Sequence, residues 1–437
     1  MHIIFTEISK YIITIFMALY AFSCFNVFRY NSEIKRKYIY FRQNLYMLAI
    51  YTITFIVLVL RYKDPKYLYF YLASMTFVVL VINISKIFYS KANRLIINNM
   101  CMLLSIGFMM LARLSFDKAV RQFIIAVFSI VITALIPYII GRGPFFSKFS
   151  WLYAISGLFA LIVVLLFSVT TFGAKISFTI FGISFQPSEF VKIIFIFAIS
   201  GFLAKSTNFK NVVLTTIIAG IHVIILVLSK DLGGAVIFFV VYLSVLYVAT
   251  CNILYFGAGL LSGSAAAVIG YKLFPHVRVR VKAFLDPIGT IETAGYQIAQ
   301  SLFAIGTGGF FGMGLGGGAP QKIPVVAADF IYAAICEEFG VFFGICLILV
   351  CVSCLVMFLN IAMRFTNKFY KYVAVGLATL YGFQVFLTIG GVTKFIPLTG
   401  VTLPLVSYGG TSVLVTIVMF SIIQGLYISV RNGINFE

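Results

Sequence analysis

Charged residues are scarce in this sequence: Asp, Glu, Lys and Arg make up only 10% of its 437 residues, against about 25% in a typical soluble globular protein. Hydrophobic residues make up 62%. So few charges cannot cover a water-exposed surface, which excludes a cytosolic enzyme, a nucleic-acid-binding module and a secreted disulfide scaffold. The apolar runs are continuous rather than alternating, which excludes an outer-membrane barrel. We therefore predict an all-α polytopic membrane protein.

Acidic residues are scarcer than basic ones, with 12 Asp and Glu against 32 Lys and Arg and a net charge of +20. In a membrane protein, excess basic residues retain loops in the cytoplasm and contact anionic lipid headgroups. The same excess is also compatible with a specific anionic ligand. The seven Cys lie in or beside apolar runs. Cys351 and Cys354 form a C-x-x-C, but no redox fold surrounds them, so we expect small apolar side chains rather than a redox or metal site.

Thirteen apolar runs are long enough to cross a membrane, which takes about 20 residues. The first run is closely followed by further spans and has no small-residue cleavage site after it, so we do not interpret it as a cleaved signal peptide. The predicted spans are 11–28, 44–60, 67–85, 96–112, 122–141, 151–170, 187–204, 212–229, 232–250, 253–274, 333–361, 372–391 and 411–430.

The basic loops after the first, third and eleventh spans weakly favour a cytoplasmic position for those loops. This predicts an N-terminus outside the cell, a cytoplasmic C-terminus and an outside position for the long segment 275–332. A segment of that length in a compact protein is usually functional or disordered, and its mixture of apolar residues and Gly argues against disorder. No internal repeat supports an inverted-repeat transporter.

Acids at span edges are costly and are candidate functional residues. Glu189 and Lys192 are i,i+3 neighbours behind Pro187, which suits a first helical turn. They form either a self-neutralising pair or part of a site. Asp231, at the mouth of the ninth span, is either a helix N-cap or a functional acid.

Two stretches of the long segment suggest ligand contact. Arg278, Arg280 and Lys282 alternate and would share one side of an extended strand, which suits a phosphate group or, alternatively, lipid headgroups. Residues 306–318 contain eight glycines. They formally include G-x-G-x-x-G, but no Rossmann unit surrounds it, so turns or close backbone approach to a ligand explain them better.

Asp329 lies where the long segment meets the next apolar run. There it is either a helix N-cap or a general base whose pKa is raised at the membrane edge. Glu337 and Glu338 lie about 12–14 Å further along a helix, too far to pair with it. Residues 391–410 contain two prolines and several glycines, which predicts a re-entrant or broken segment.

Together these stretches resemble the SEDS family of shape, elongation, division and sporulation proteins, typified by RodA and FtsW. Their common order and spacing over about residues 180–430 carry the resemblance. The matching elements are Gln186-Pro187-Ser188-Glu189 with Lys192, Asp231-Leu232-Gly233, Phe284-Leu285-Asp286-Pro287, Gly295-Tyr296-Gln297, Gln300-Ser301, Ala304-Ile305-Gly306 with Gly308-Gly309, Asp329-Phe330-Ile331, Glu337-Glu338, and Leu403-Pro404-Leu405-Val406-Ser407-Tyr408-Gly409-Gly410.

The resemblance implies a ten-helix core at 96–437, preceded by three extra helices within 1–95. It also implies a peptidoglycan glycosyltransferase of the bacterial cytoplasmic membrane that polymerises lipid II with a class B penicillin-binding protein. Asp329 would deprotonate the acceptor hydroxyl or organise the site, and cations would stabilise the leaving pyrophosphate, a role that Mg²⁺ or Mn²⁺ could share. The implied site residues are the catalytic Asp329 and, for substrate binding, Arg280, Arg278, Lys282, Lys394, Glu189, Lys192, Asp231, Gln300 and Ser407; no metal ligand is predicted.

One departure leaves alternatives open. Many family members carry polar residues between Pro and Asp in this motif, whereas Pro324 here is followed by Val325-Val326-Ala327-Ala328. A lipid II flippase would use the same cationic pocket without depending on Asp329 for bond formation. A non-catalytic scaffold for the penicillin-binding protein is the third hypothesis. Because Asp329 is present, we favour the enzyme.

Overall fold

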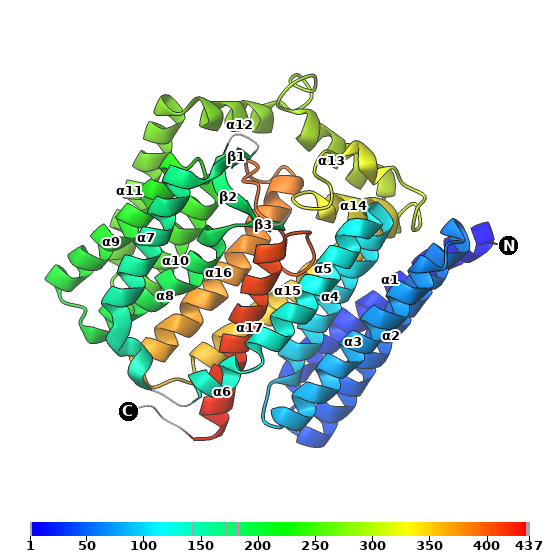
Figure 1. The fold of residues 1–437 in the computed structure, drawn as a ribbon, viewed down its shortest axis with the longest axis horizontal. Helices are drawn as coiled ribbons and strands as arrows, with labels where there is room; N and C mark the ends of the chain where they lie inside the picture. Colours follow the sequence, from blue (N-terminus) through cyan, green and yellow to red (C-terminus); the bar gives the residue numbers. More distant parts are fainter. Residues whose placement is uncertain (1, 142–143, 172–173, 181–182, 434–437) are drawn as a thin grey trace. The chain divides into compact units, whose positions relative to one another are not determined.

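The computed structural model describes residues 2–141, 144–171, 174–180 and 183–433, and these residues form mostly helices (Figure 1). Within this described part, thirteen helices are long and apolar enough to cross a membrane. The prediction of an all-α polytopic membrane protein is therefore confirmed. The long helices are α1 (His2–Arg29), α2 (Glu33–Tyr62), α3 (Lys66–Phe88), α4 (Arg94–Leu114), α5 (Phe116–Thr133), α7 (Ser150–Phe167), α8 (Pro187–Lys205), α9 (Phe209–Leu228), α10 (Leu232–Thr250), α11 (Ile253–Leu273), α15 (Val341–Ala362), α16 (Lys368–Val392) and α17 (Gly410–Arg431).

Shorter elements connect these helices. A small antiparallel sheet of order β1-β2-β3 between α7 and α8 was not predicted; β1 pairs with β2 and β2 with β3, for example through Thr179 and Ser184. Its strands are rich in β-branched and aromatic residues, which suit a pleated surface. The short elements are α6 (Ile136–Ile140), η1 (Pro144–Phe149), β1 (Val169–Thr171), β2 (Ala174–Ile180), β3 (Ile183–Phe185), α12 (Pro275–Leu285), α13 (Tyr296–Gly308), η2 (Pro320–Lys322) and α14 (Ile331–Phe339).

The predicted eleventh span, 333–361, is wrong at its start. The chain forms the short helix α14 first, and the span α15 begins only at Val341. Gly340 separates the two helices with φ +89°, a backbone conformation that side chains disfavour and that ends an α-helix. The apolar run is continuous in sequence, so hydropathy alone does not reveal this break.

The chain divides into two compact units, which are described separately. Unit 1 comprises Met1–Ile132, Lys282–Cys354 and Thr388–Gly409; unit 2 comprises Thr133–Val281, Leu355–Leu387 and Gly410–Glu437. In unit 1, α2 packs against α1, α3 and α4, and α13 packs against α14. In unit 2, α7 packs against α8 and α9, and α17 packs against α6 and α8.

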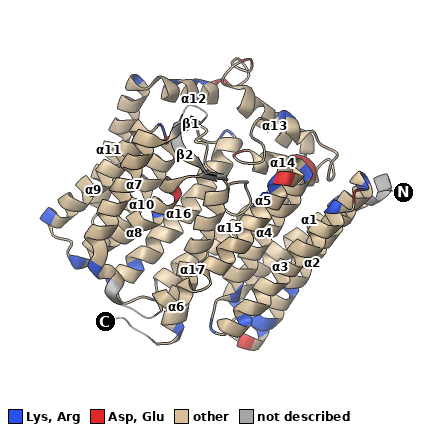
Figure 2. Cartoon of the chain, viewed as in Figure 1, with Lys and Arg blue, Asp and Glu red and all other residues tan. Residues whose placement is uncertain are grey.

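Charged residues gather near the ends of helices, and the helix bodies are mostly uncharged (Figure 2). Within the described residues, the buried charged side chains are Glu189, Lys192, Glu337 and Glu338. Burying a charge is expensive unless it is paired or hydrogen-bonded. These four residues therefore mark places where the protein supplies specific partners.

A buried polar network joins four helices of unit 1. The Asn99 side chain on α4 accepts hydrogen bonds from Tyr20 Oη at 3.0 Å and Cys24 Sγ at 3.2 Å, both on α1, and donates to Ser353 Oγ on α15 at 2.8 Å. Gln43 on α2 approaches Cys24 Sγ at 3.5 Å. Lipid gives helices no hydrophobic reason to associate, so such hydrogen bonds and close packing hold them together.

We expect Asn99→Leu to lower the free energy of unfolding by about 1–3 kcal/mol, because it leaves buried polar partners unsatisfied. Thermal unfolding of the purified protein in detergent measures the change. Asn83→Leu, an exposed position on α3, is the matched control. Equal stability of the Asn99 variant and the control would show that the network contributes nothing.

Candidate active site

Asp329 lies in unit 1, in the turn that leads into α14, and its side chain is half-buried. Phe330 occupies the N-cap position of α14, so the interpretation of Asp329 as a simple N-cap is wrong. The carboxylate approaches the loop between α16 and α17: a Cβ on Gly400 would lie 3.6 Å from Asp329 Oδ2. Gly400 itself has φ +77°, a backbone conformation that glycine adopts more readily than any other residue.

The loop between α16 and α17 holds the backbone just before Asp329. Ser407 Oγ donates a hydrogen bond to the Ala328 carbonyl at 2.6 Å, and the Tyr408 amide donates to the Ala327 carbonyl at 2.7 Å. Ser407 Oγ also accepts from the Leu403 amide at 2.9 Å. We call these three hydrogen bonds the loop clamp. Residues 398–403 carry no regular secondary structure, as expected for a broken segment.

A buried glutamine of α5 hydrogen-bonds to the same loop that forms the loop clamp. Gln122 Nε2 donates to the Ser407 carbonyl at 2.9 Å, and Gln122 Oε1 accepts from the Gly409 amide at 3.2 Å. The side chain thus satisfies a backbone acceptor and a backbone donor that no helix satisfies. Sequence reasoning missed this residue, because a single Gln within an apolar run resembles many helix-packing residues.

The loop clamp bears on the apolar residues 325–328, which stand where many family members have polar ones. At Ala327 and Ala328, backbone carbonyls rather than side chains make the contacts that fix the turn before Asp329. The turn is also strained, since the β-branched Val325 has φ +55°. In the facing loop, Lys394 and Leu405 have φ +57° and +67°. Such backbone costs about 1–3 kcal/mol per residue and gathers at functional sites.

The buried acids Glu337 and Glu338 hold the glycine-rich loop 309–318. Glu337 Oε1 accepts from the Ala319 amide at 2.8 Å, and the Glu337 and Glu338 carbonyls accept from the amides of Met313 and Gly314. A Cβ on Gly308 or Gly312 would collide with the α14 backbone. The backbone does approach closely at these glycines, but the neighbour is the protein's own α14; close approach to a ligand stays a prediction.

Arg113, at the end of α4, pairs with Glu338: Nε lies 2.9 Å from Oε1, and the guanidinium also approaches the Gly318 carbonyl at 3.4 Å. The Glu338 side chain is 0% exposed. Burial raises its pKa to about 7, and Arg113 opposes that rise. Sequence reasoning missed Arg113, which is separated from Glu338 by more than two hundred residues.

The N-terminal helices also contact the glycine-rich loop. The rings of Tyr11 on α1 and Phe311 have centroids 5.3 Å apart. A Cβ on Gly314 would lie 3.4 Å from Thr6 of α1, and one on Gly316 would meet the Arg61 guanidinium of α2. The extra helices and this loop therefore form part of one packed unit.

In unit 2, the predicted site residues Glu189, Lys192 and Asp231 lie close to one another, and Arg280 is near Asp231. Lys192 Nζ is 2.5 Å from Glu189 Oε1, and both side chains are buried. Asp231 N-caps α10 by accepting from the Gly234 amide at 2.8 Å, as one alternative expected. Burial raises the pKa of Asp231; the hydrogen bond from the Gly234 amide and the charges of Lys192 and Arg280 lower it, and Glu189 adds to the rise.

Arg278, Arg280 and Lys282 lie on the helix α12, not on an extended strand. The expectation that alternation places them on one side is therefore wrong: Arg278 and Lys282, four residues apart, share one face, and Arg280 turns away from it. His276 joins this group, because burial, Arg280 and Lys230 lower its pKa. Sequence reasoning missed His276, although it lies two residues before Arg278.

The remaining predicted residues lie in unit 1. Gln300 is half-buried on α13; its neighbour Ser301 donates to the Val392 carbonyl at 2.8 Å, two residues before the half-buried Lys394. Lys282 is exposed. Among the described residues, no three His, Cys, Asp or Glu side chains are grouped to hold a metal ion. Asp329 is thus a single carboxylate donor, which would suit only a cation held largely by substrate phosphates.

The thirteen candidate spans and the constrained acid Asp329 define a polytopic membrane protein with a candidate active site in the loops that connect its helices. A family profile described as "Cell cycle protein" (FtsW/RodA/SpoVE) matches residues 93–432. The chain therefore belongs to this family, which confirms the SEDS resemblance.

Named relatives agree with this membership. Mycobacterium leprae "Peptidoglycan glycosyltransferase RodA" is 38% identical over 276 residues, which cover 60% of this chain and 59% of the relative. Buchnera aphidicola "Probable peptidoglycan glycosyltransferase FtsW" is 31% identical over 319 residues, covering 70% and 90%. The chain thus matches less than two thirds of the mycobacterial protein's length.

The fold is shared with a chain from a solved peptidoglycan synthase complex, whose structure describes the coordination of polymerization and crosslinking. The TM-score is 0.67 at 22% identity, and the similarity covers 79% of this chain and 99% of that chain.

The buried Glu338 predicts a pH dependence of stability. Its folded pKa, about 7, exceeds its ordinary value of 4.5. The folded state therefore holds the proton more tightly than the unfolded chain. The resulting stabilisation is complete below pH 4.5 and is lost as the pH rises to 7, by about 3 kcal/mol.

We expect Glu338→Gln to flatten the fall in thermal stability between pH 5 and pH 8. Thermal unfolding across this range measures the slope, and Glu292→Gln, at an exposed position in the long segment, should retain the wild-type slope. Identical slopes for all three proteins would contradict the assignment.

Proposed function

We propose that this protein is a peptidoglycan glycosyltransferase that polymerises lipid II into glycan strands during bacterial cell-wall synthesis. Family membership supports the proposal, as do the activities in the names of the mycobacterial and Buchnera relatives. The observation that carries it is the loop clamp, which fixes the backbone just before the half-buried acid Asp329.

Asp329 is assigned as the general base. Its carboxylate accepts the proton of the acceptor sugar's 4-hydroxyl while that oxygen attacks the anomeric carbon of the donor sugar. The new glycosidic bond forms as the bond to the donor's undecaprenyl pyrophosphate breaks. A base acts only if it stays within hydrogen-bond reach of the hydroxyl; the loop clamp, which fixes the backbone just before Asp329, supports this assignment.

The departing pyrophosphate needs positive charge, because negative charge develops on its oxygen as the bond breaks. Arg280, Arg278, Lys282 and Lys394 are assigned to this role. Lys192 is mainly occupied by Glu189, so this pair and Asp231 are assigned to positioning. Gln300 is assigned a substrate contact and Ser407 the support of Asp329.

A divalent cation, Mg²⁺ or Mn²⁺, belongs to the proposal only as a companion of the substrate's phosphates. Asp329 is the single carboxylate that the protein would offer it, and Mg²⁺ is often bound by one or two carboxylates and substrate phosphates. Such an ion would neutralise phosphate charge. No step assigned above to the protein depends on it.

The partner that we propose is a class B penicillin-binding protein, which would crosslink the new strands. The fold shared with a chain of a peptidoglycan synthase complex supports this. In the orientation proposed, the N-terminus and the segment 275–332 lie outside the cytoplasmic membrane and the C-terminus lies inside. A C-terminal green fluorescent protein fusion should then fluoresce.

We expect Asp329→Asn to reduce polymerisation of labelled lipid II by about 100- to 10,000-fold, the usual contribution of a general base. Purified wild type and variant are compared with and without the cognate penicillin-binding protein. Glu292→Gln is the control. A folded wild type that makes no polymer even with its partner would favour the scaffold or the flippase, which scrambling of labelled lipid II in vesicles separates.

We expect Ser407→Ala to slow turnover by about ten- to a hundredfold, because it releases two hydrogen bonds of the loop clamp and misplaces Asp329. The Michaelis constant for lipid II should change little, and Ser407→Thr, which keeps the hydroxyl, should restore part of the rate. An equal loss of rate in both variants would show that the hydroxyl does not position Asp329.

A further inference from the structure

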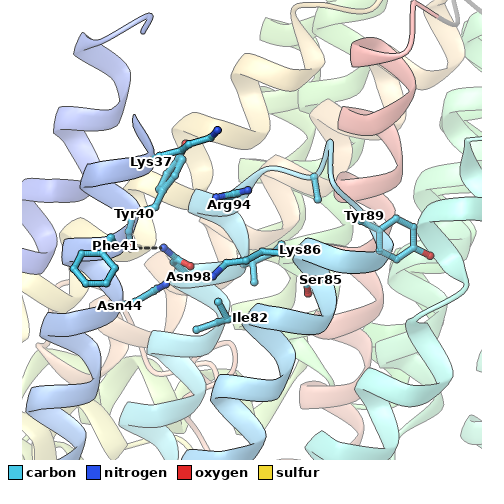
Figure 3. A pocket seen from close by; sticks show the side chains of 12 residues that line it. Lys37, Tyr40, Phe41, Asn44, Ile82, Ser85, Lys86, Tyr89, Arg94 and Asn98 are labelled. Carbon is cyan, nitrogen blue, oxygen red and sulfur yellow. Dashed lines mark hydrogen bonds between the residues drawn. The ribbon is translucent and has the colours of Figure 1, made fainter. Parts of the chain in front are cut away.

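A pocket of about 200 Å³ lies between α2, α3 and α4 of unit 1, and none of the residues assigned above lines it (Figure 3). It lies at the start of α2, the end of α3 and the start of α4. By the same measure of volume, one water needs only about 10–15 Å³, so the hollow holds far more than a single water. That is space for a phosphate group together with a short polar substituent.

Three cations from three different helices line this pocket. They are Lys37 on α2, Lys86 on α3 and Arg94 on α4 (Figure 3). None of the described lining residues is acidic. Within the part of the chain that the structure describes, none of the three forms an ion pair with a carboxylate. Like charges around one hollow repel one another, and a bound anion relieves that repulsion.

A buried polar atom in the same lining also lacks a partner. Asn44 Oδ1 is buried and accepts no hydrogen bond. By contrast, Asn98 in the same lining has a hydrogen-bond partner: its Nδ2 donates to Gln43 Oε1 at 3.0 Å. An unsatisfied buried acceptor calls for an explanation, and a hydroxyl on the ligand would supply the missing donor.

The surroundings favour a lipid over a soluble anion. Arg94 begins one candidate span, Lys86 lies in the last turn of another and Lys37 lies just past the first turn of a third, near the level at which headgroups meet a membrane protein. Phe41 and Ile82 add apolar lining. The last turn of α3 also exposes Ile87 and Phe88, at 76% and 75% of their surfaces, which acyl chains could cover.

We propose that this pocket binds the phosphate of an anionic phospholipid headgroup, with a headgroup hydroxyl at Asn44. Lys37, Lys86 and Arg94 neutralise the phosphate, with the Arg94 guanidinium able to contact two of its oxygens. Phosphatidylglycerol has this combination of one negative charge and free hydroxyls. The site belongs to the helices that precede or begin the family match at residue 93, and it does not depend on the proposed glycosyltransferase activity.

Native mass spectrometry of the delipidated full-length protein tests this proposal. Phosphatidylglycerol is titrated in detergent, with phosphatidylcholine as the neutral reference, and inorganic phosphate and glycerol 3-phosphate are added as soluble competitors. The variant is Lys86→Gln with Arg94→Gln. The matched control is Lys35→Gln with Lys91→Gln, which removes the same net charge at residues outside the lining.

We expect the double variant of the lining to bind phosphatidylglycerol about tenfold or more weakly, and the control to stay within about twofold of wild type. Equal losses in both would show general surface attraction and overturn the proposal, as would equal binding of phosphatidylcholine. Competition at millimolar inorganic phosphate, with no preference for the lipid, would assign the site to a soluble phosphate instead.

A second variant keeps the test valid if the charge variant unfolds. Asn44→Leu retains every cation but removes the acceptor for the headgroup hydroxyl. It should weaken phosphatidylglycerol binding several-fold and leave binding of phosphatidic acid, which has no such hydroxyl, unchanged. Unchanged binding of both lipids would overturn the assignment of Asn44.

Discussion

Backbone that leaves the helix near a membrane must find its hydrogen bonds within the protein, and unit 1 is organised around this requirement. The side chains of Ser407 and Gln122 hydrogen-bond to backbone amides and carbonyls of the loop between α16 and α17 and of the turn before Asp329. The Glu337 carboxylate accepts a hydrogen bond from the Ala319 amide, which directly follows the glycine-rich loop. These polar side chains therefore serve at least partly to hydrogen-bond irregular backbone. That backbone in turn holds Asp329 beside Gly400.

This constraint also explains why strain is tolerated near Asp329. A β-branched residue such as Val325 would relax from φ +55° if its turn were free. The hydrogen bonds from Ser407 and Tyr408 to the two following alanines oppose that relaxation. Polar side chains at these alanine positions are therefore not needed to fix the turn, although they could add contacts to a substrate.

Much of the helical framework follows from the sequence, because apolar runs of span length have few other solutions. The N-cap Asp231, the pair of Glu189 and Lys192, and the irregular segment after α16 follow from local chemistry. The break at Gly340 does not, since it depends on a backbone angle rather than on hydropathy. Arg113 and Gln122 could not be predicted either, because their roles arise only when distant segments meet.

The N-terminal helices are coupled to the candidate site by the same kind of interaction. Asn99 joins α1, α4 and α15 through buried hydrogen bonds, and Tyr11 and Arg61 contact the glycine-rich loop that Glu337 and Glu338 retain. In lipid, where apolar burial gives no preference for one helix neighbour over another, these contacts decide how α1–α3 pack. Whatever stabilises the packing of α2, α3 and α4 therefore also stabilises the support of that loop.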